Sequence, residues 1–150
     1  MMDAAQAVWP QIVAALKSDA ALVALNGGRI YDRPPPPGKG ARKMPCTTRG
    51  PSQTLPFTND GDRGCSVSVQ IDNWSETTEA GVYQPRAANE MNAAVCAALF
   101  GEDCITAPAG WLVQGVWPES SEVIADPDGV TAHGIVRVRI ELTPSGVNDD

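Results

Sequence analysis

Polar and apolar residues alternate strictly in two segments of the chain. In residues 65–72 apolar side chains stand at every second position, and residues 134–142 repeat the pattern. Successive side chains of a strand point to opposite faces, so both segments are predicted to be strands with one buried face. The expected buried positions are Cys65, Val67, Val69 and Ile71 in the first strand, and Val136, Val138, Ile140 and Leu142 in the second.

Three other segments show helical spacing. Apolar residues recur at every fourth position in residues 3–17 and again in residues 85–100, which predicts two amphipathic helices. A shorter helix is expected over residues 19–25, because Asn26-Gly27-Gly28 tolerates the left-handed conformation at a helix end. Small residues in the helix at 85–100 allow a close approach to a sheet; its predicted buried face is Ala87, Met91, Val95 and Leu99.

The remaining pattern completes one α+β domain over residues 1–142. Further strands are expected at residues 44–55, 111–117 and 121–125, with turns at residues 58–64 and at the DPDG sequence of residues 126–129. The prediction is a mainly antiparallel sheet with the N-terminal helix and a second long helix packed on one face. An extended Pro-rich arm leaves this domain, and residues 143–150 are expected to form a flexible tail.

The arm is a basic, Pro-rich loop at residues 33–49. Four consecutive prolines favour the extended polyproline conformation, and no acidic residue occurs between Arg33 and Asn59. Two interpretations stay open: the loop docks against an acidic surface or passing DNA, or it only aids solubility. Five of the chain's eleven positive residues lie here, and they are candidate partner contacts: Arg33, Lys39, Arg42, Lys43 and Arg49.

Composition excludes several functional classes. A net charge of −7 argues against a dedicated nucleic-acid binder, whose affinity would come from neutralising phosphates. No apolar run approaches the ~20 residues of a membrane span, and the first residues lack the basic region of a secretory signal. The cysteines form no metal-binding pair, and Cys65 and Cys96 are expected to be small buried hydrophobic residues in a reduced compartment.

The sequence also lacks a coherent catalytic motif. His133 is the only histidine, so a Cys–His hydrolase remains an alternative, although no spacing supports such a pair. Asp126 and Asp128 flank a proline in a turn, where aspartate usually bonds nearby backbone N–H groups. Residues 59–62 begin like a calcium loop, but no glutamate closes it. We therefore expect no enzyme activity, no cofactor and no metal.

Arg137 and Arg139 stand two residues apart on the polar face of the last strand. They are candidate contacts to another subunit, to a partner's acids or to phosphate. The other interpretation is a solvated face with cross-strand partners, such as acids on the strand that holds Asp72.

Taken together, these segments resemble the tail completion proteins of long-tailed phages, also called tail terminators or head–tail joining proteins. Similar proteins occur in phage-like gene transfer agents. The resemblance covers residues 3–142, and it rests on the segments GRIYDRPPP, CSVSVQIDNWSE and DPDGVTAHGIVRVRIEL. It is weakest at residues 37–58, where the loop is longer than usual, so the contacts of the arm are not part of it.

The resemblance implies a structural virion protein that forms a ring, expected to be a hexamer. Such a ring caps the tail tube at the head-proximal end of the tail and joins it to the head. Its partners would be further copies of the chain, the tail tube protein and a head-completion or stopper protein. DNA would pass through the hole, no membrane would be involved, and the chain would be made in the host cytoplasm. The alternative within the same particle is another neck ring, such as the stopper.

Overall fold

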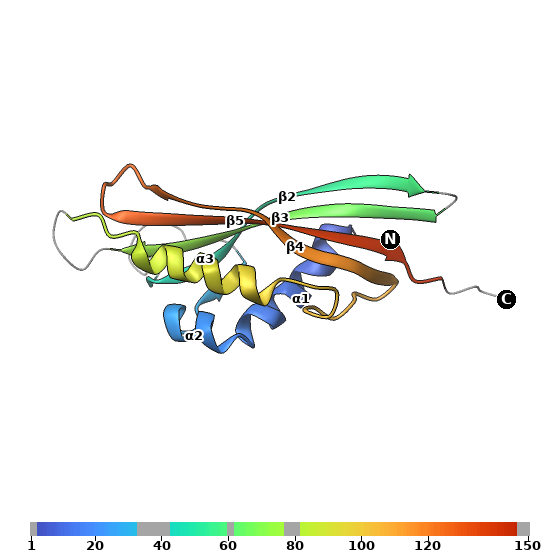
Figure 1. Ribbon diagram of the computed structural model, residues 1–150, viewed down its shortest axis with the longest axis horizontal. Coiled ribbons are helices and arrows are strands. Elements are labelled where there is room, and N and C mark those ends of the chain that lie inside the picture. The colour runs from blue at the N-terminus through green and yellow to red at the C-terminus, as the bar shows by residue number, and fades with distance from the viewer. Residues whose placement is uncertain (1–2, 33–42, 60–61, 77–81, 147–150) are drawn as a thin grey trace.

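The computed structural model describes residues 3–32, 43–59, 62–76 and 82–146. One five-stranded sheet has the order β1-β2-β3-β5-β4, with β1 parallel to β2 and all other neighbours antiparallel. The helices lie together on one face of this sheet (Figure 1). The predicted single α+β domain is confirmed. Its elements are α1 (Ala4–Lys17), α2 (Ala20–Asn26), β1 (Ile30–Tyr31), β2 (Cys46–Asn59), β3 (Asp62–Glu76), α3 (Arg86–Ala98), β4 (Trp111–Ala125) and β5 (Thr131–Pro144).

The two alternating segments form the centre of the sheet as β3 and β5. Val67, Ile71, Val138 and Ile140 are almost completely buried beneath the helices. Helix α1 begins at Asp3, whose carboxylate accepts hydrogen bonds from backbone N–H groups of the first turn. Among the described residues no single helix is long and apolar enough to span a membrane; α1 and α2 pass that test only as a pair bent by 84°.

The strands extend beyond their predicted ends. Strands β2 and β3 run through most of the predicted turn at 58–64, and β4 is continuous where two pieces were expected. A register shift between Pro118 and Ser120 accommodates the proline on this edge strand. Strand β5 reaches Pro144, and the N–H of Ser145 donates to Gly110 O at 3.0 Å. Cross-strand hydrogen bonds therefore persist after the side-chain alternation has ended.

Two corrections to the predicted boundaries follow. Residues 46–49 belong to β2 and not to the Pro-rich loop, and residues 143–144 belong to β5 and not to a flexible tail. The central part of the predicted arm, residues 33–42, lies outside the described residues.

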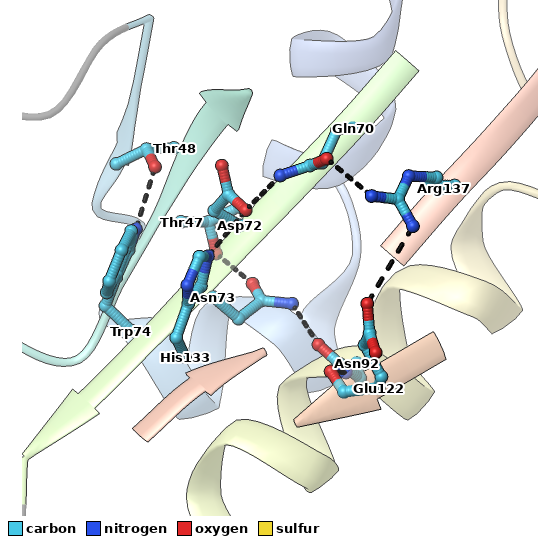
Figure 2. A network of polar contacts seen from close by, with 10 residues as sticks. All are labelled: Thr47, Thr48, Gln70, Asp72, Asn73, Trp74, Asn92, Glu122, His133 and Arg137. Carbon is cyan, nitrogen blue, oxygen red and sulfur yellow. Dashed lines mark hydrogen bonds and ion pairs between the residues drawn. The ribbon is translucent and has the colours of Figure 1, made fainter. Parts of the chain in front are cut away.

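A chain of buried amide and hydroxyl groups crosses the interface between sheet and helices. The Asn26 amide donates to Thr47 Oγ1 at 2.9 Å, the Thr47 hydroxyl donates to Asn73 Oδ1 at 2.7 Å, and the Asn73 amide donates to Asn92 Oδ1 at 2.9 Å. The last three residues appear in Figure 2. All four are at most 2% exposed, so each hydrogen bond replaces water that cannot reach the group. This series of hydrogen bonds links α2, β2, β3 and α3.

Asn92 also fixes α3 against the outer strands. Its amide donates to Ser121 Oγ at 3.2 Å and to Glu122 O at 3.0 Å in β4. Strand β5 passes beneath this side chain at Gly134, where an added Cβ would lie 2.4 Å from Asn92 Oδ1. Only glycine leaves room for the amide, so the smallest residue of β5 sets the distance between α3 and the sheet.

We expect Gly134→Ala to lower the free energy of unfolding by about 1–3 kcal/mol, because the added methyl group must displace a fully hydrogen-bonded amide. Chemical denaturation measures the change. Gly146→Ala is the matched control, since nothing lies within 4 Å of its added Cβ. Equal free energies of unfolding for the two variants would show that the Asn92 side chain can move aside without loss of stability.

Candidate functional site: the open face of the sheet

In the described part of the chain, the sheet face opposite the helices is not covered by any helix (Figure 1). Residues paired across neighbouring strands share a face, and the register places both polar and apolar side chains here. Three of the five most exposed large apolar side chains belong to this face: Leu55, Leu112 and Ile124. Its other members include Ser66, Ser68, Gln70, Asp72, Trp74, Trp117, Glu122, His133, Ile135, Arg137, Arg139 and Glu141.

His133 is part of a packed cluster at one end of this face. Its ring stacks on Trp74, with centroids 3.8 Å apart and planes inclined by 11°. Its Nε2 lies 2.7 Å from Asp72 Oδ1, and the Trp74 indole N–H donates to Thr48 Oγ1 at 2.9 Å. Figure 2 shows how these groups meet above β2, β3 and β5. Gly50 is required beside them, because a Cβ there would lie 2.6 Å from Asp72 Oδ2.

Arg137 and Arg139 both lie on the open face, and both have acidic partners on the neighbouring strand β4. Arg139 Nε is 2.7 Å from Glu119 Oε1, and Arg137 Nη1 is 3.8 Å from Glu122 Oε1. Arg137 also donates to Gln70 Oε1 at 3.3 Å (Figure 2). The acids come from β4, whereas the sequence had suggested the strand of Asp72; that aspartate is held by His133 instead.

The other predicted contact residues do not gather on this face. Arg49 lies on the helix side, 3.4 Å from Asp32 Oδ1, with its guanidinium carbon 5.1 Å from the centre of the Trp9 ring. Lys43 is exposed just before β2. Arg33, Lys39 and Arg42 lie outside the described residues. Of the members of this set that the structure describes, Arg137 and Arg139 are the two that lie together on the open face.

The cysteines do not supply a nucleophile for His133. Burial raises the pKa of the Cys65, Cys96 and Cys104 thiols, which leaves little reactive thiolate at neutral pH. Cys46 is buried in β2 and separated from His133 by Trp74, its partner in β3. Among the described residues no group of three or more histidine, cysteine or acidic side chains is arranged to hold a metal ion.

The DPDG turn is explained by local hydrogen bonds. The Gly129 N–H donates to Asp126 O at 2.9 Å, which closes the turn, and Gly129 has φ +75°. Asp128 accepts from the backbone N–H groups of Val130 and Thr131 at 2.9 and 2.8 Å and from the Thr131 hydroxyl. The bond from the Thr131 hydroxyl, followed by the backbone bonds, lowers the pKa of Asp128. The carboxylate thus orders the start of β5.

Sequence reasoning missed the stack of Trp74 on His133 and the buried amide chain. Both depend on the register of β3 against its neighbours, which pairs Trp74 with His133 and Thr47 with Asn73. The one available signal was the polar run that interrupts the alternation after Ile71.

The family model for the tail completion protein gp17 matches residues 10–142, and the chain belongs to this family. It is a family of structural virion proteins and not of enzymes, so the Cys–His hydrolase alternative falls.

A solved structure supports the same fold. A chain in the virion of a native gene transfer agent particle aligns with a TM-score of 0.77 and 20% sequence identity, over 95% of this chain and 99% of that one. At this identity the likeness concerns the fold. Comparison with curated protein sequences gives no significant match.

We expect His133→Ala to lower the free energy of unfolding by about 1–3 kcal/mol, because it removes the ring stack and leaves the buried Asp72 carboxylate without this partner. At low temperature the folded variant should assemble into particles normally. Thermal melting and particle yield provide the two readings, with Glu141→Gln as a control on the same face. Normal melting without particles would instead indicate a direct role for the imidazole.

The lowered pKa of Asp128 predicts a pH-dependent contribution to stability. This contribution is complete above the ordinary value of 3.8 and disappears as the pH falls through the lower folded value. We expect Asp128→Asn to melt below the wild type near neutral pH and the difference to close in strong acid. Melting temperatures across the pH range test this, with Asp126→Asn as the charge-matched control. A difference that persists in acid would contradict the assignment.

Proposed function

We propose that this chain is a tail terminator. Several copies form a ring, expected to be a hexamer, that caps the tail tube at its head-proximal end and joins the tail to the head. The single observation that carries the proposal is the match to the tail completion family over residues 10–142. The virion origin of the structural neighbour and the uncovered sheet face both support an assembly role.

A closed ring needs two different surfaces on each copy. Head-to-tail contacts close into rings, whereas a two-fold contact gives only a dimer. The open sheet face and the basic segment around Lys39, Arg42 and Lys43 are chemically different, and the basic segment belongs to the connection between β1 and β2. We assign them as two parts of the assembly surface, with Arg33 in the basic segment and Arg137 and Arg139 on the open face.

The ring position requires DNA to pass through the hole without sticking. Binding to DNA is driven by neutralising phosphates with cations, and the chain carries a net charge of −7. An acidic ring repels the duplex and lets it slide. The remaining partners would be the tail tube protein on one side and a head-completion or stopper protein on the other.

Imaging of intact particles tests the proposal. The chain should be present in several symmetry-related copies directly above the last tube ring. A position between this ring and the head would favour the stopper alternative. One copy per tail would contradict both.

Reversing Lys39, Arg42 and Lys43 to glutamate should leave the isolated chain folded. Four preceding prolines cannot donate ladder hydrogen bonds, and substitutions outside the core usually change stability by less than about 0.5 kcal/mol. We expect fewer completed tails, because the reversed charges repel an acidic partner. Salt screens this repulsion, so the loss relative to the wild type should shrink at high salt.

Melting temperature and particle yield separate the possible outcomes of this charge reversal. Unchanged melting with unchanged yield would show a loop that only aids solubility. A collapsed melting temperature would show that the segment packs into the fold.

A further inference from the structure

Two neighbouring cavities lie along α1 on the helix side of the molecule, outside the open face. These cavities, of about 350 and 310 Å³, lie between α1 and the segment 104–111, and Gln11 lines both. Figure 1 shows this segment passing beside α1. We call the two cavities together the α1 groove.

The two ends of the α1 groove differ in chemistry. One end is lined by Pro10, Pro108 and Trp111, which present flat apolar surfaces. The other end holds Asp19, and the exposed Glu102 and Asp103 come directly before its lining residue Cys104. No lining residue of either cavity is a cation. The groove is therefore suited to an apolar, extended segment with positive charges at one end.

We propose that the α1 groove binds the Pro-rich basic segment of a neighbouring copy of this chain, residues 33–43. Polyproline segments dock on aromatic-lined surfaces because their extended shape loses little entropy on binding. In the sequence RPPPPGKGARK three of the four cations, Lys39, Arg42 and Lys43, follow the prolines, so the prolines match Trp111 and these three side chains match Asp19. The proposal rests on the assembly function above, since it needs a second copy.

The segment cannot fill the apolar end of the groove in its own copy. Tyr31 stands in one row with Thr48, Asp72 and Ile135, whereas Trp111 pairs with Pro144, nine residues further along β5. That offset is about 30 Å at ~3.3 Å per residue. The segment 33–42 is joined to the described part of the chain at Asp32 and at Lys43. Because it is held at both ends, only about half of it, roughly five residues, can extend away from the sheet, which gives a maximum reach of about 18 Å.

The placement also fits a head-to-tail contact. The segment leaves the sheet at the β1 side, and Trp111 belongs to β4 at the opposite edge. A segment that extends from one edge and a groove near the other edge are complementary between neighbours that follow one another in a ring.

A labelled peptide of residues 32–44, DRPPPPGKGARKM, tests the proposal by fluorescence anisotropy. The receptor is the full chain carrying Lys39→Ala, Arg42→Ala and Lys43→Ala, which weakens competition by its own segment. We expect saturable binding. Gln11→Lys in the receptor should raise the Kd on the order of tenfold, because it places a positive charge where the two cavities meet.

Two controls make the result specific. Ala93→Lys adds the same charge to an exposed position of α3 outside the groove, and it should leave the Kd unchanged. A peptide with the four prolines replaced by alanine keeps every charge, and it should bind more weakly.

Three results would contradict binding of the segment in the α1 groove. They are the absence of saturable binding, equal effects of Gln11→Lys and Ala93→Lys, and equal binding of both peptides. Because the assay contains no particle, such a result would leave the ring position untouched. Imaging that showed one copy per tail would overturn the assembly function independently.

Discussion

The contact of Gly134 with the Asn92 amide is the constraint on which the arrangement of this molecule depends. Asn92 ends a buried chain of hydrogen bonds that begins at Asn26, and every group in it is shielded from water. A buried amide left without its partner lowers the free energy of unfolding by about 1–3 kcal/mol. This series of hydrogen bonds therefore strongly favours one position of α3 over the sheet. The close approach at Gly134 is the condition under which all of these bonds form together.

This constraint gives the two faces of the sheet different roles. The helix face carries the apolar core and the amide chain, which leaves little freedom for movement. The open face also carries exposed ion pairs such as Arg137 with Glu122, and exposed pairs of this kind contribute only about 0–1 kcal/mol. Such pairs are easily exchanged for pairs with another molecule. We therefore propose that the buried helix face of the sheet serves folding, whereas the open face, the basic segment and the outer side of α1 serve assembly.

The sequence predicts the fold well where one periodicity governs a whole element. Residues 65–72 and 134–142 alternate because one face of each strand is buried, and the helix predicted at 85–100 is found at Arg86–Ala98. Prediction fails where polar residues enter the core. Asn73 and Asn92 are buried because they bond one another across 19 residues of sequence, which no local pattern records.

The open face shows the same limit. Its composition was predictable, since Arg137 and Arg139 occupy the polar positions of an alternating strand. Their partners were not, because these depend on β5 lying between β3 and β4. The side chains opposite each arginine follow from strand order and from the bulge after Pro118, and neither is a property of one segment.

Hydrogen exchange of the backbone amides, compared between the free chain and the chain in assembled particles, tests most directly whether folding and assembly use separate parts of the molecule. The account predicts that β3 and β5 are equally protected in both states, because their amides are already paired within the sheet. New protection should appear in residues 33–43, which we propose to become bound on assembly. Strong new protection of β3 and β5 on assembly would contradict the account, since the core would then be completed only by contact with other subunits.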